Sequence, residues 1–155
     1  MDSAPAWECH CSVDVAVPVS FAWQYMSDIR NWSDPPAEFG LDGPFASGSV
    51  GWTQMPGEPA RSWTLRDVEP ERAYTIVGGS FLVGAVLLVQ WQFDALSAEN
   101  ARLTERLELS GENAAAYVED VRAAFEPNLE PGMRRIAMMM ERAAEICRPG
   151  EAACT

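Results

Sequence analysis

The feature that most constrains this chain is a long amphipathic segment near its C-terminal end, from Asn113 to Cys147. Apolar side chains recur there every three or four residues, the spacing that places them on one face of a helix. The positions are Ala114, Tyr117, Val121, Phe125, Leu129, Met133, Ile136, Met140 and Ala143. The segment therefore predicts a long helix whose apolar face the rest of the chain must cover.

Two prolines fall inside this segment. As one straight helix, about 35 residues would span roughly 52 Å, whereas a compact chain of this length has a diameter of about 40 Å. Pro127 and Pro131 each remove a helical hydrogen bond, and Gly132 loosens the same place. We therefore expect the helix to bend or break between Phe125 and Met133.

Short alternating segments make up the chain before this helix. From Trp7 to Val17 apolar and polar residues alternate, which predicts a half-buried strand. Pro18 then opens a helix over residues 19–28, and Asp28 can cap a second short helix over residues 29–32. Further strands are predicted at residues 38–41, 49–55, 61–68, 72–78, 82–95 and 101–110. All links between these strands are short, so the sheet should be antiparallel throughout.

These elements predict a single α+β domain over residues 1–155, with a core from about 7 to 147 and a flexible tail at 148–155. A chain of 155 residues can bury one core but not two. A seven-stranded sheet that is rich in glycine should twist and curl, and the long helix can lie in its concave side. The space between sheet and helix then forms a pocket.

Composition excludes several kinds of catalysis. The chain has no lysine, so it cannot perform Schiff-base chemistry, attach pyridoxal phosphate or hydrolyse nucleotides with a phosphate loop. Its single histidine, His10, should lie on the outer face of the first strand with Glu8 and Ser12. We therefore expect His10 to be a surface residue.

Charge and hydropathy bear on the partners of the chain. The formal net charge of -12 repels nucleic acid and anionic membrane surfaces. The longest apolar run, Phe81 to Val89, is too short to insert into a membrane as a helix and is interpreted as a buried strand. The N-terminus lacks the basic start and apolar core of a secretory signal, so a cytoplasmic protein is expected.

The four cysteines predict neither disulfides nor a metal centre. Cys9, Cys11, Cys147 and Cys154 are expected to be reduced thiols. A metal site built from Cys9, His10 and Cys11 with a tail cysteine is disfavoured, because His10 would point to the opposite side of the strand. No metal and no cofactor are therefore expected.

Three stretches of the chain resemble a known family. Residues 13–35 read VDVAVPVSFAWQYMSDIRNWSDP, residues 68–76 read VEPERAYTI, and residues 101–112 read ARLTERLELSGE. In the first stretch Pro18 opens the helix, Trp23 lies inside it, Asp28 ends it and Trp32 follows. Together these features resemble the START-related SRPBCC superfamily of polyketide cyclases, dehydrases and lipid-transport proteins, over most of the chain.

The resemblance implies a helix-grip fold. In this fold a curved seven-stranded antiparallel sheet wraps around a long C-terminal helix, two short helices follow the first strand, and a hydrophobic tunnel separates sheet and helix. Members of the superfamily, which share the birch-pollen-allergen fold, bind sterols, lipids, hormones and polyketides, and some catalyse cyclisation or aromatisation. The family has no universal catalytic residue to carry over. Pro127 and Pro131 depart from its usual, less interrupted helix.

Side chains expected to line the tunnel come from the sheet and from the long helix. Large apolar residues of the strands should face the helix, and two tyrosines could each present a hydroxyl to a ligand. The predicted ligand-binding residues are Cys11, Trp52, Trp63, Tyr74, Trp91, Leu107, Tyr117, Phe125, Met133, Ile136 and Met140. The alternative is that these side chains fill the core and leave no cavity, although six tryptophans are many for packing alone.

Glu105 is the candidate catalytic residue. In strand 101–110 it shares a face with the leucines, because side chains alternate along a strand. A carboxyl group among leucines would be desolvated, its pKa would rise, and it could act as a general acid or base. Alternatively, the strand end is open to solvent, or Glu105 pairs with an arginine such as Arg61 or Arg134.

Two classes of function fit this chain, as a monomer or homodimer. The first is a carrier or sensor that binds a small hydrophobic or aromatic molecule, such as a lipid or polyketide, in the tunnel. The second is a polyketide cyclase- or aromatase-like enzyme that uses a few polar pocket residues. An enzyme needs a convergent polar pair, such as Glu105 with a tyrosine or arginine, whereas a binder's tunnel can be almost wholly apolar. A structural or partner-binding role ranks third.

Overall fold

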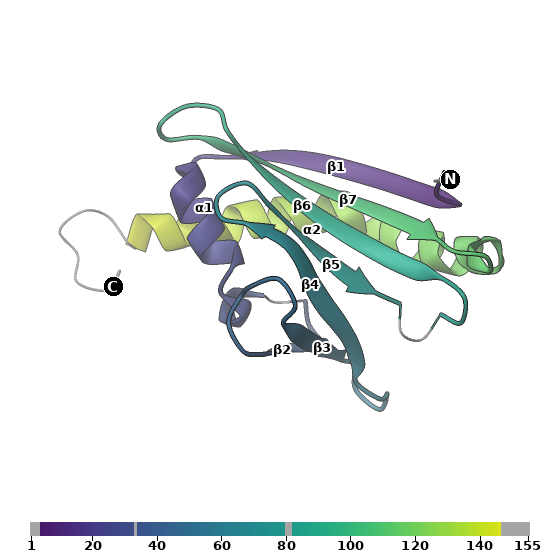
Figure 1. Ribbon diagram of the computed structural model, residues 1–155. Coiled ribbons are helices and arrows are strands. Elements are labelled where there is room, and N and C mark those ends of the chain that lie inside the picture. Colours follow the sequence, from purple (N-terminus) through teal and green to yellow (C-terminus); the bar gives the residue numbers. More distant parts are fainter. Residues whose placement is uncertain (1–3, 33, 80–81, 147–155) are drawn as a thin grey trace.

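The structure is a computed structural model that describes residues 4–32, 34–79 and 82–146. Seven strands form one sheet, two short helices follow the first strand, and a long helix ends the described chain (Figure 1). The elements are β1 (Trp7–Val15), α1 (Val19–Met26), η1 (Ile29–Asn31), β2 (Glu38–Asp42), β3 (Val50–Gln54), β4 (Arg61–Glu69), β5 (Ala73–Gly78), β6 (Val86–Ala95), β7 (Ala101–Ser110), η2 (Ala114–Tyr117) and α2 (Val118–Ile146). The predicted order of strands and helices is confirmed.

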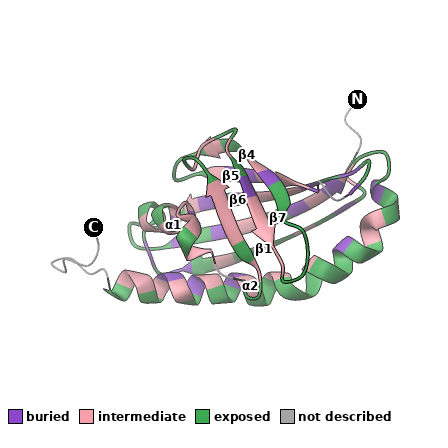
Figure 2. Ribbon diagram, turned by 90° about the horizontal axis from the view of Figure 1, so that it is seen from below, coloured by how far each residue is buried: buried purple, intermediate pink, exposed green. Residues whose placement is uncertain are grey.

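All neighbouring strands run antiparallel, in the spatial order β1-β7-β6-β5-β4-β3-β2. Strands β2 to β7 are neighbours in sequence order because short turns join them. The first strand then pairs with the last, β7. α2 lies along one face of this sheet (Figures 1 and 2), which is the expected helix-grip arrangement.

Strand β7 shows how the sequence sets this arrangement. Its alanine and leucine side chains are buried, whereas its arginines are exposed. Since side chains alternate along a strand, one face of β7 points at α2 and the other at solvent. On the outer face Arg102 pairs with Asp14, and Arg106 pairs with Glu8, both on the adjacent β1.

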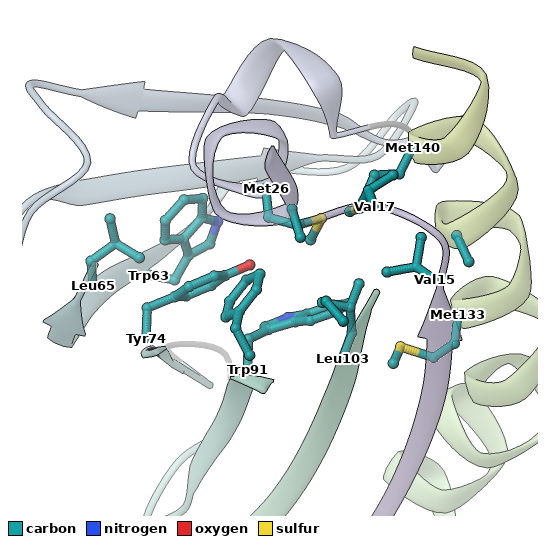
Figure 3. Close-up of a cluster of buried hydrophobic side chains, with 14 residues drawn as sticks. Val15, Val17, Met26, Trp63, Leu65, Tyr74, Trp91, Leu103, Met133 and Met140 are labelled. Atoms are coloured by element: carbon teal, nitrogen blue, oxygen red, sulfur yellow. The ribbon is translucent and has the colours of Figure 1, made fainter. Parts of the chain in front are cut away.

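The core beneath α2 consists of two clusters of buried side chains. The first cluster joins α1, the centre of the sheet and the C-terminal half of α2, and includes Trp63, Tyr74, Trp91, Leu103, Met133 and Met140. Figure 3 shows it, with Tyr74 and Trp91 next to each other on neighbouring strands and Met133 reaching in from α2. The second cluster joins the other end of the sheet to the N-terminal half of α2, and includes Trp7, Leu82, Leu87, Leu107, Leu109 and Val121.

Two glycines make room for tryptophan rings on neighbouring strands. Gly51 lies opposite Trp63 in the β3–β4 pair, and a Cβ atom at position 51 would overlap the Trp63 ring. Gly40 stands in the same relation to Trp52 in the β2–β3 pair. Because residues 51 and 52 are adjacent in one strand, the two tryptophan rings lie on opposite faces of the sheet. Trp63 is buried in the first cluster, so Trp52 lies on the outer face.

The start of β6 differs from the prediction. The sequence predicts a strand from residue 82, but β6 begins at Val86. Leu82 instead belongs to a turn, in which its N–H donates to the Gly79 carbonyl at 2.7 Å. Gly79 and Gly84 have φ angles of 93° and 77°, a backbone conformation that glycine adopts readily and a strand does not contain. Phe81, the first residue of the apolar run, lies outside the described residues.

The sequence predicts that α2 bends or breaks, and the structure shows a bend without a break. The helix is continuous from Val118 to Ile146 and contains both Pro127 and Pro131. Figure 2 shows that it curves in its first half, where an interior proline loses a hydrogen bond and crowds the preceding turn. The Asn128 side chain donates to the Ala124 carbonyl at 3.2 Å, which supplies a hydrogen bond beside Pro127.

The length of α2 is accommodated without a break. Its 29 residues span roughly 43 Å, and the helix continues past the sheet near the C-terminus (Figure 1). Charged side chains follow its solvent face. No helix within the described ranges combines the length and the hydropathy needed to cross a membrane.

Candidate functional site

A cavity of about 760 Å³ lies between the sheet and α2, bordered by side chains of both core clusters. Strands β5, β6 and β7 form one wall, and the middle of α2 forms the opposite wall. The end of α1, the loop before β2, Phe39 of β2 and Met55 directly after β3 complete it. The lining residues are Tyr25, Met26, Asn31, Trp32, Asp34, Pro35, Pro36, Ala37, Phe39, Met55, Tyr74, Ile76, Val89, Trp91, Glu105, Ala124, Phe125, Asn128, Leu129, Pro131, Gly132, Arg135, Ile136 and Met139.

One row of side chains crosses the sheet wall of the cavity. Cys11, Glu105, Trp91 and Tyr74 are direct partners on the adjacent strands β1, β7, β6 and β5. Direct partners in an antiparallel sheet lie on the same face, with Cβ atoms about 5 Å apart. Glu105 therefore lies between Trp91 and Cys11, and Tyr74 lies beyond Trp91.

Glu105 faces the cavity from the middle of β7. Burial, together with the nearby Asp34 carboxylate, raises the pKa of Glu105 to about 7. Among the described residues no hydrogen bond or cation contributes to this pKa. The two arginines suggested as partners pair elsewhere, Arg61 with Glu58 and Arg134 with Glu130. Glu105 is therefore an uncompensated acid that is about half ionised at neutral pH.

Tyr74 is a second polar group at the cavity. Its ring stacks between Trp32 and Trp91, with centroid distances of 6.4 and 6.3 Å. Its hydroxyl is buried and has no hydrogen-bond partner in the part of the chain that the structure describes. Burial, with a smaller effect from Glu105, raises the pKa of Tyr74 well above its usual value, so the hydroxyl stays protonated. A bound molecule could satisfy this donor.

An ion pair spans the exposed side of the cavity. Arg135 of α2 and Asp34 of the loop before β2 both line the cavity, and their charged atoms lie 3.1 Å apart. The two side chains are 43% and 72% exposed, so the pair lies where the cavity meets solvent. Trp32 of the same loop is anchored by its indole N–H, which donates to the Met26 carbonyl at 2.7 Å.

The predicted site residues fall into three groups. Tyr74, Trp91, Glu105, Phe125 and Ile136 line the cavity. Trp63, Leu107, Met133 and Met140 lie on the predicted face but are buried in the core clusters, outside the cavity lining. These four side chains pack within the core.

The third group lies elsewhere. Cys11 is half-buried on the inner face of β1 and does not line the cavity. Trp52 lies on the outer face, because the pairing of Gly51 with Trp63 turns position 52 outward. The hydroxyl of Tyr117 donates to the Val83 carbonyl at 3.2 Å, away from the cavity. Trp52 and Tyr117 therefore lie outside the cavity lining.

Several lining residues were not predicted. On α2 the cavity is lined by a second stripe of side chains with helical spacing, which lies beside the apolar stripe of this helix. Its members are Asn128, Gly132, Arg135 and Met139. If the apolar face of α2 were taken to be one residue wider than the predicted stripe, it would include Met139. The pair of Asp34 and Arg135 joins residues about a hundred positions apart, and no local pattern indicates it.

The thiols of β1 are poor candidates for chemistry. Cys9 and Cys11 are free, while Cys147 and Cys154 lie outside the described residues. Burial is the main cause that raises the pKa of Cys9 to about 11, and it also raises the pKa of Cys11. His10 is exposed, as predicted. In the described ranges no group of three or more His, Cys, Asp and Glu side chains could hold a metal ion.

Comparison with known proteins gives matches in structure but not in sequence. No protein-family model matches the chain, and no curated protein matches its sequence. A norcoclaurine synthase structure from Thalictrum flavum superposes with a TM-score of 0.69 at 15% identity, covering 89% of this chain and 96% of that one. The Zhui aromatase/cyclase from Streptomyces sp. R1128 gives 0.66 at 19% identity, covering 94% and 99%. A Thermobifida fusca protein gives 0.67 at 14% identity, covering 87% and 93%.

These matches extend over nearly the whole length of both chains, so they concern the complete fold rather than one motif. At identities this low a structural likeness is evidence of fold, and function has to be argued from the site. The neighbours include the kinds of protein that the sequence resemblance named. The chain has a helix-grip fold, as its sequence implied.

Proposed function

We propose that this protein binds a small hydrophobic or aromatic molecule, such as a lipid or a polyketide, in the cavity between the sheet and α2. The observation that carries the proposal is a cavity of about 760 Å³ with mostly apolar walls. Small-molecule sites in proteins typically have volumes of roughly 300–1,000 Å³, with apolar walls and a few polar groups. Glu105 and Tyr74 supply such groups inside this cavity.

Aromatic side chains favour a ligand that contains rings. The cavity is lined by Trp32, Phe39, Tyr74, Trp91 and Phe125. Aromatic rings gain from stacked or edge-to-face contacts beyond the area that they bury. A flat ring system would find such contacts on both walls, from Trp91 on the sheet and from Phe125 on α2.

A titration with the neutral hydrophobic dye Nile red tests this proposal. We expect a saturable rise in dye emission at one site per chain. Phe125→Trp should weaken binding about tenfold, because the larger ring takes up space in the cavity. Met138→Trp is the matched control, since Met138 is 48% exposed on α2 and does not line the cavity. Emission that never saturates, or equal affinities in the two variants, would contradict the proposal.

A second candidate is a polyketide cyclase- or aromatase-like enzyme, and Glu105 is the observation that favours it. A general acid or base works best when its pKa lies near the operating pH, and the pKa of Glu105 is about 7. As a carboxylate it could accept a proton from the carbon between two ketones. The enolate so formed would attack another ketone of the same molecule and form a carbon–carbon bond. The acid form of Glu105 could then give the proton to the resulting alkoxide oxygen, which becomes the alcohol.

The two candidates differ in their response to Glu105→Gln. With a synthetic linear poly-β-ketone thioester as substrate, an enzyme should form a cyclised product, and Glu105→Gln should remove that activity while Nile red still binds. A protein that only binds should form no cyclised product above the uncatalysed rate in either form. Product formation unaffected by Glu105→Gln would exclude this residue as the acid or base.

A further inference from the structure

We propose that the cavity holds an organic cation, an apolar ring-containing molecule whose protonated amine lies between the Glu105 carboxylate and the Trp91 ring. This inference rests on the proposed function and adds the charge of the ligand. The inference that the ligand is a cation rests on two features around Glu105: the charges near its carboxylate and the aromatic ring beside it.

The first observation is a carboxylate without a counter-ion. Glu105 lines the cavity, and its neighbouring charge is a second carboxylate, Asp34. Among the described lining residues Arg135 is the only basic side chain, and it pairs with Asp34 at 3.1 Å. Glu105 is half-buried, and a carboxylate that is largely shielded from water destabilises the protein unless a cation pairs with it or a proton binds. A ligand that brings a positive charge removes this cost.

The second observation is the aromatic ring beside that carboxylate. Trp91 is the direct partner of Glu105 in the β6–β7 pair, so their side chains lie on one face about 5 Å apart at Cβ. Tryptophan has the ring face that attracts cations most strongly. An ammonium group at this position would meet a carboxylate and a π-face at once. Its apolar part would lie against the remaining aromatic wall.

The other titratable groups around Glu105 supply no spare positive charge. The thiols of β1 and the phenols of α1 and β5 have raised pKa values and are neutral. On α2, Glu130 pairs with Arg134, and Glu126 pairs with Arg122. The groups that face Glu105 or its neighbours are Cys9, Cys11, Tyr25, Asp34, Tyr74, Glu126, Glu130, Arg134 and Arg135. Each charged side chain in this set belongs to an ion pair. Glu105 is the carboxylate in this region that has no cationic partner among the described residues.

Other ligand charges fit less well. An anionic molecule such as a fatty acid would add a third carboxylate near Glu105 and Asp34, where the guanidinium of Arg135 is already engaged. A neutral ring would fill the apolar space but leave Glu105 without a cation. The formal net charge of -12 also raises the local concentration of cations around the protein.

The test uses three probes that share a naphthalene ring and differ in one group. They are 1-naphthylmethylamine, 1-naphthalenemethanol and 1-naphthoic acid, each titrated into the full-length protein by calorimetry. At about pH 8 the amine should bind about tenfold more tightly than the alcohol, and the acid should bind most weakly. Equal affinities of the amine and the alcohol would overturn the inference.

Glu105→Gln keeps the shape of the side chain and removes its charge. It should weaken binding of the amine about tenfold and leave binding of the alcohol within about twofold. Glu108→Gln is the matched control, because Glu108 lies on the outer face of the same strand and pairs with Arg106 at 3.1 Å. A preference for the amine that survives Glu105→Gln would overturn the inference.

The wild-type protein gives an independent readout through pH. The amine stays protonated between pH 6 and pH 8, whereas Glu105, with a pKa of about 7, changes from mostly neutral to mostly ionised. Affinity for the amine should therefore rise about tenfold over this range, and affinity for the alcohol should not rise. An amine affinity that is flat or falls with pH would contradict the inference.

Failure of this inference can be told apart from failure of the proposed function. If Nile red binds at a saturable site but the amine shows no preference or none of the naphthalene probes binds, the cationic ligand alone is excluded. If Nile red does not bind either, the proposed function fails together with the inference.

Discussion

A single carboxyl group, Glu105, couples the cavity to pH. Its pKa is about 7 in the folded chain instead of 4.5. Below about pH 4.5 the group is protonated in both folded and unfolded states and has no effect on stability. As pH rises toward 7 the unfolded chain loses the proton first, so the folded state loses stability. Above about pH 7 the loss of folding free energy no longer grows, and its total is on the order of 3 kcal/mol.

Glu105→Gln should therefore stabilise the unliganded protein at high pH. We expect the free energy of unfolding to rise by about 1–3 kcal/mol at pH 8 and to change little at pH 4.5. Urea unfolding at both pH values measures this, with Glu108→Gln on the outer face as the control. A variant that is less stable than wild type at pH 8 would mean that Glu105 has a stabilising partner.

Tyr74 makes a second prediction at the residue scale. Its hydroxyl is buried without a partner among the described residues, and a buried donor that is not hydrogen-bonded costs about 1–3 kcal/mol. Tyr74→Phe should therefore leave the free energy of unfolding unchanged or raise it by about 1 kcal/mol. Thermal unfolding of the unliganded variant checks this. A loss greater than about 1 kcal/mol would show that the hydroxyl makes a stabilising contact.

Some site residues follow from sequence and others do not, for reasons that differ by residue. Glu105 could be placed because β7 alternates over its whole length, with leucines that fix which face is buried. The outward position of Trp52 could not be predicted, because β3 is only five residues long and its inward positions are held by Gly51 and Thr53, which give no apolar pattern. The Asp34–Arg135 pair depends on how α2 lies over the loop before β2, which only the assembled fold decides.

At the scale of elements, close packing of strands β3 and β4 depends on Gly51. A side chain there would overlap the buried ring of Trp63, whose indole N–H donates to the Thr53 hydroxyl at 3.0 Å. Gly51→Ala should lower the free energy of unfolding by about 1–3 kcal/mol, since the ring has to shift. Chemical unfolding with tryptophan emission as the readout measures this.

Gly132 in α2 provides the opposite case and serves as the control. A Cβ atom at this position would meet no atom within 4 Å, and alanine is favoured over glycine inside a helix by about 0.5–1 kcal/mol. Gly132→Ala should therefore raise the free energy of unfolding slightly. If both substitutions destabilise the protein equally, backbone strain rather than the Trp63 ring would explain the effect at Gly51.

Helices and strands were predictable where periodicity was long, and their ends were not. The apolar spacing of α2 extends over many turns, so its existence and its covered face were clear from sequence. That the helix continues through Pro127 and Pro131 could not be predicted from sequence. Contacts with the sheet stabilise the helix where the prolines remove its own hydrogen bonds. The start of β6 depends on the backbone angles of Gly79 and Gly84.

At the scale of the whole molecule, the cavity is the space that the two core clusters leave between them. Leu103 belongs to the first cluster and Leu107 to the second, and Glu105 lies between them on the same face of β7. The bend of α2 lies over this gap, and Pro131 and Gly132 line it. A bound molecule would contact both clusters and should stabilise the fold by mass action.

The most direct test of this account is an amide NMR titration of the labelled protein with Nile red. We predict saturable shifts around Tyr74, Trp91 and Glu105 and along α2 from Ala124 to Met139, the two walls of the cavity. Val83 and Val86, which are 75% and 40% exposed, offer an alternative apolar surface outside it. Saturable shifts confined to that surface, or no saturable shifts at all, would contradict the claim that the protein binds its ligand between the sheet and α2.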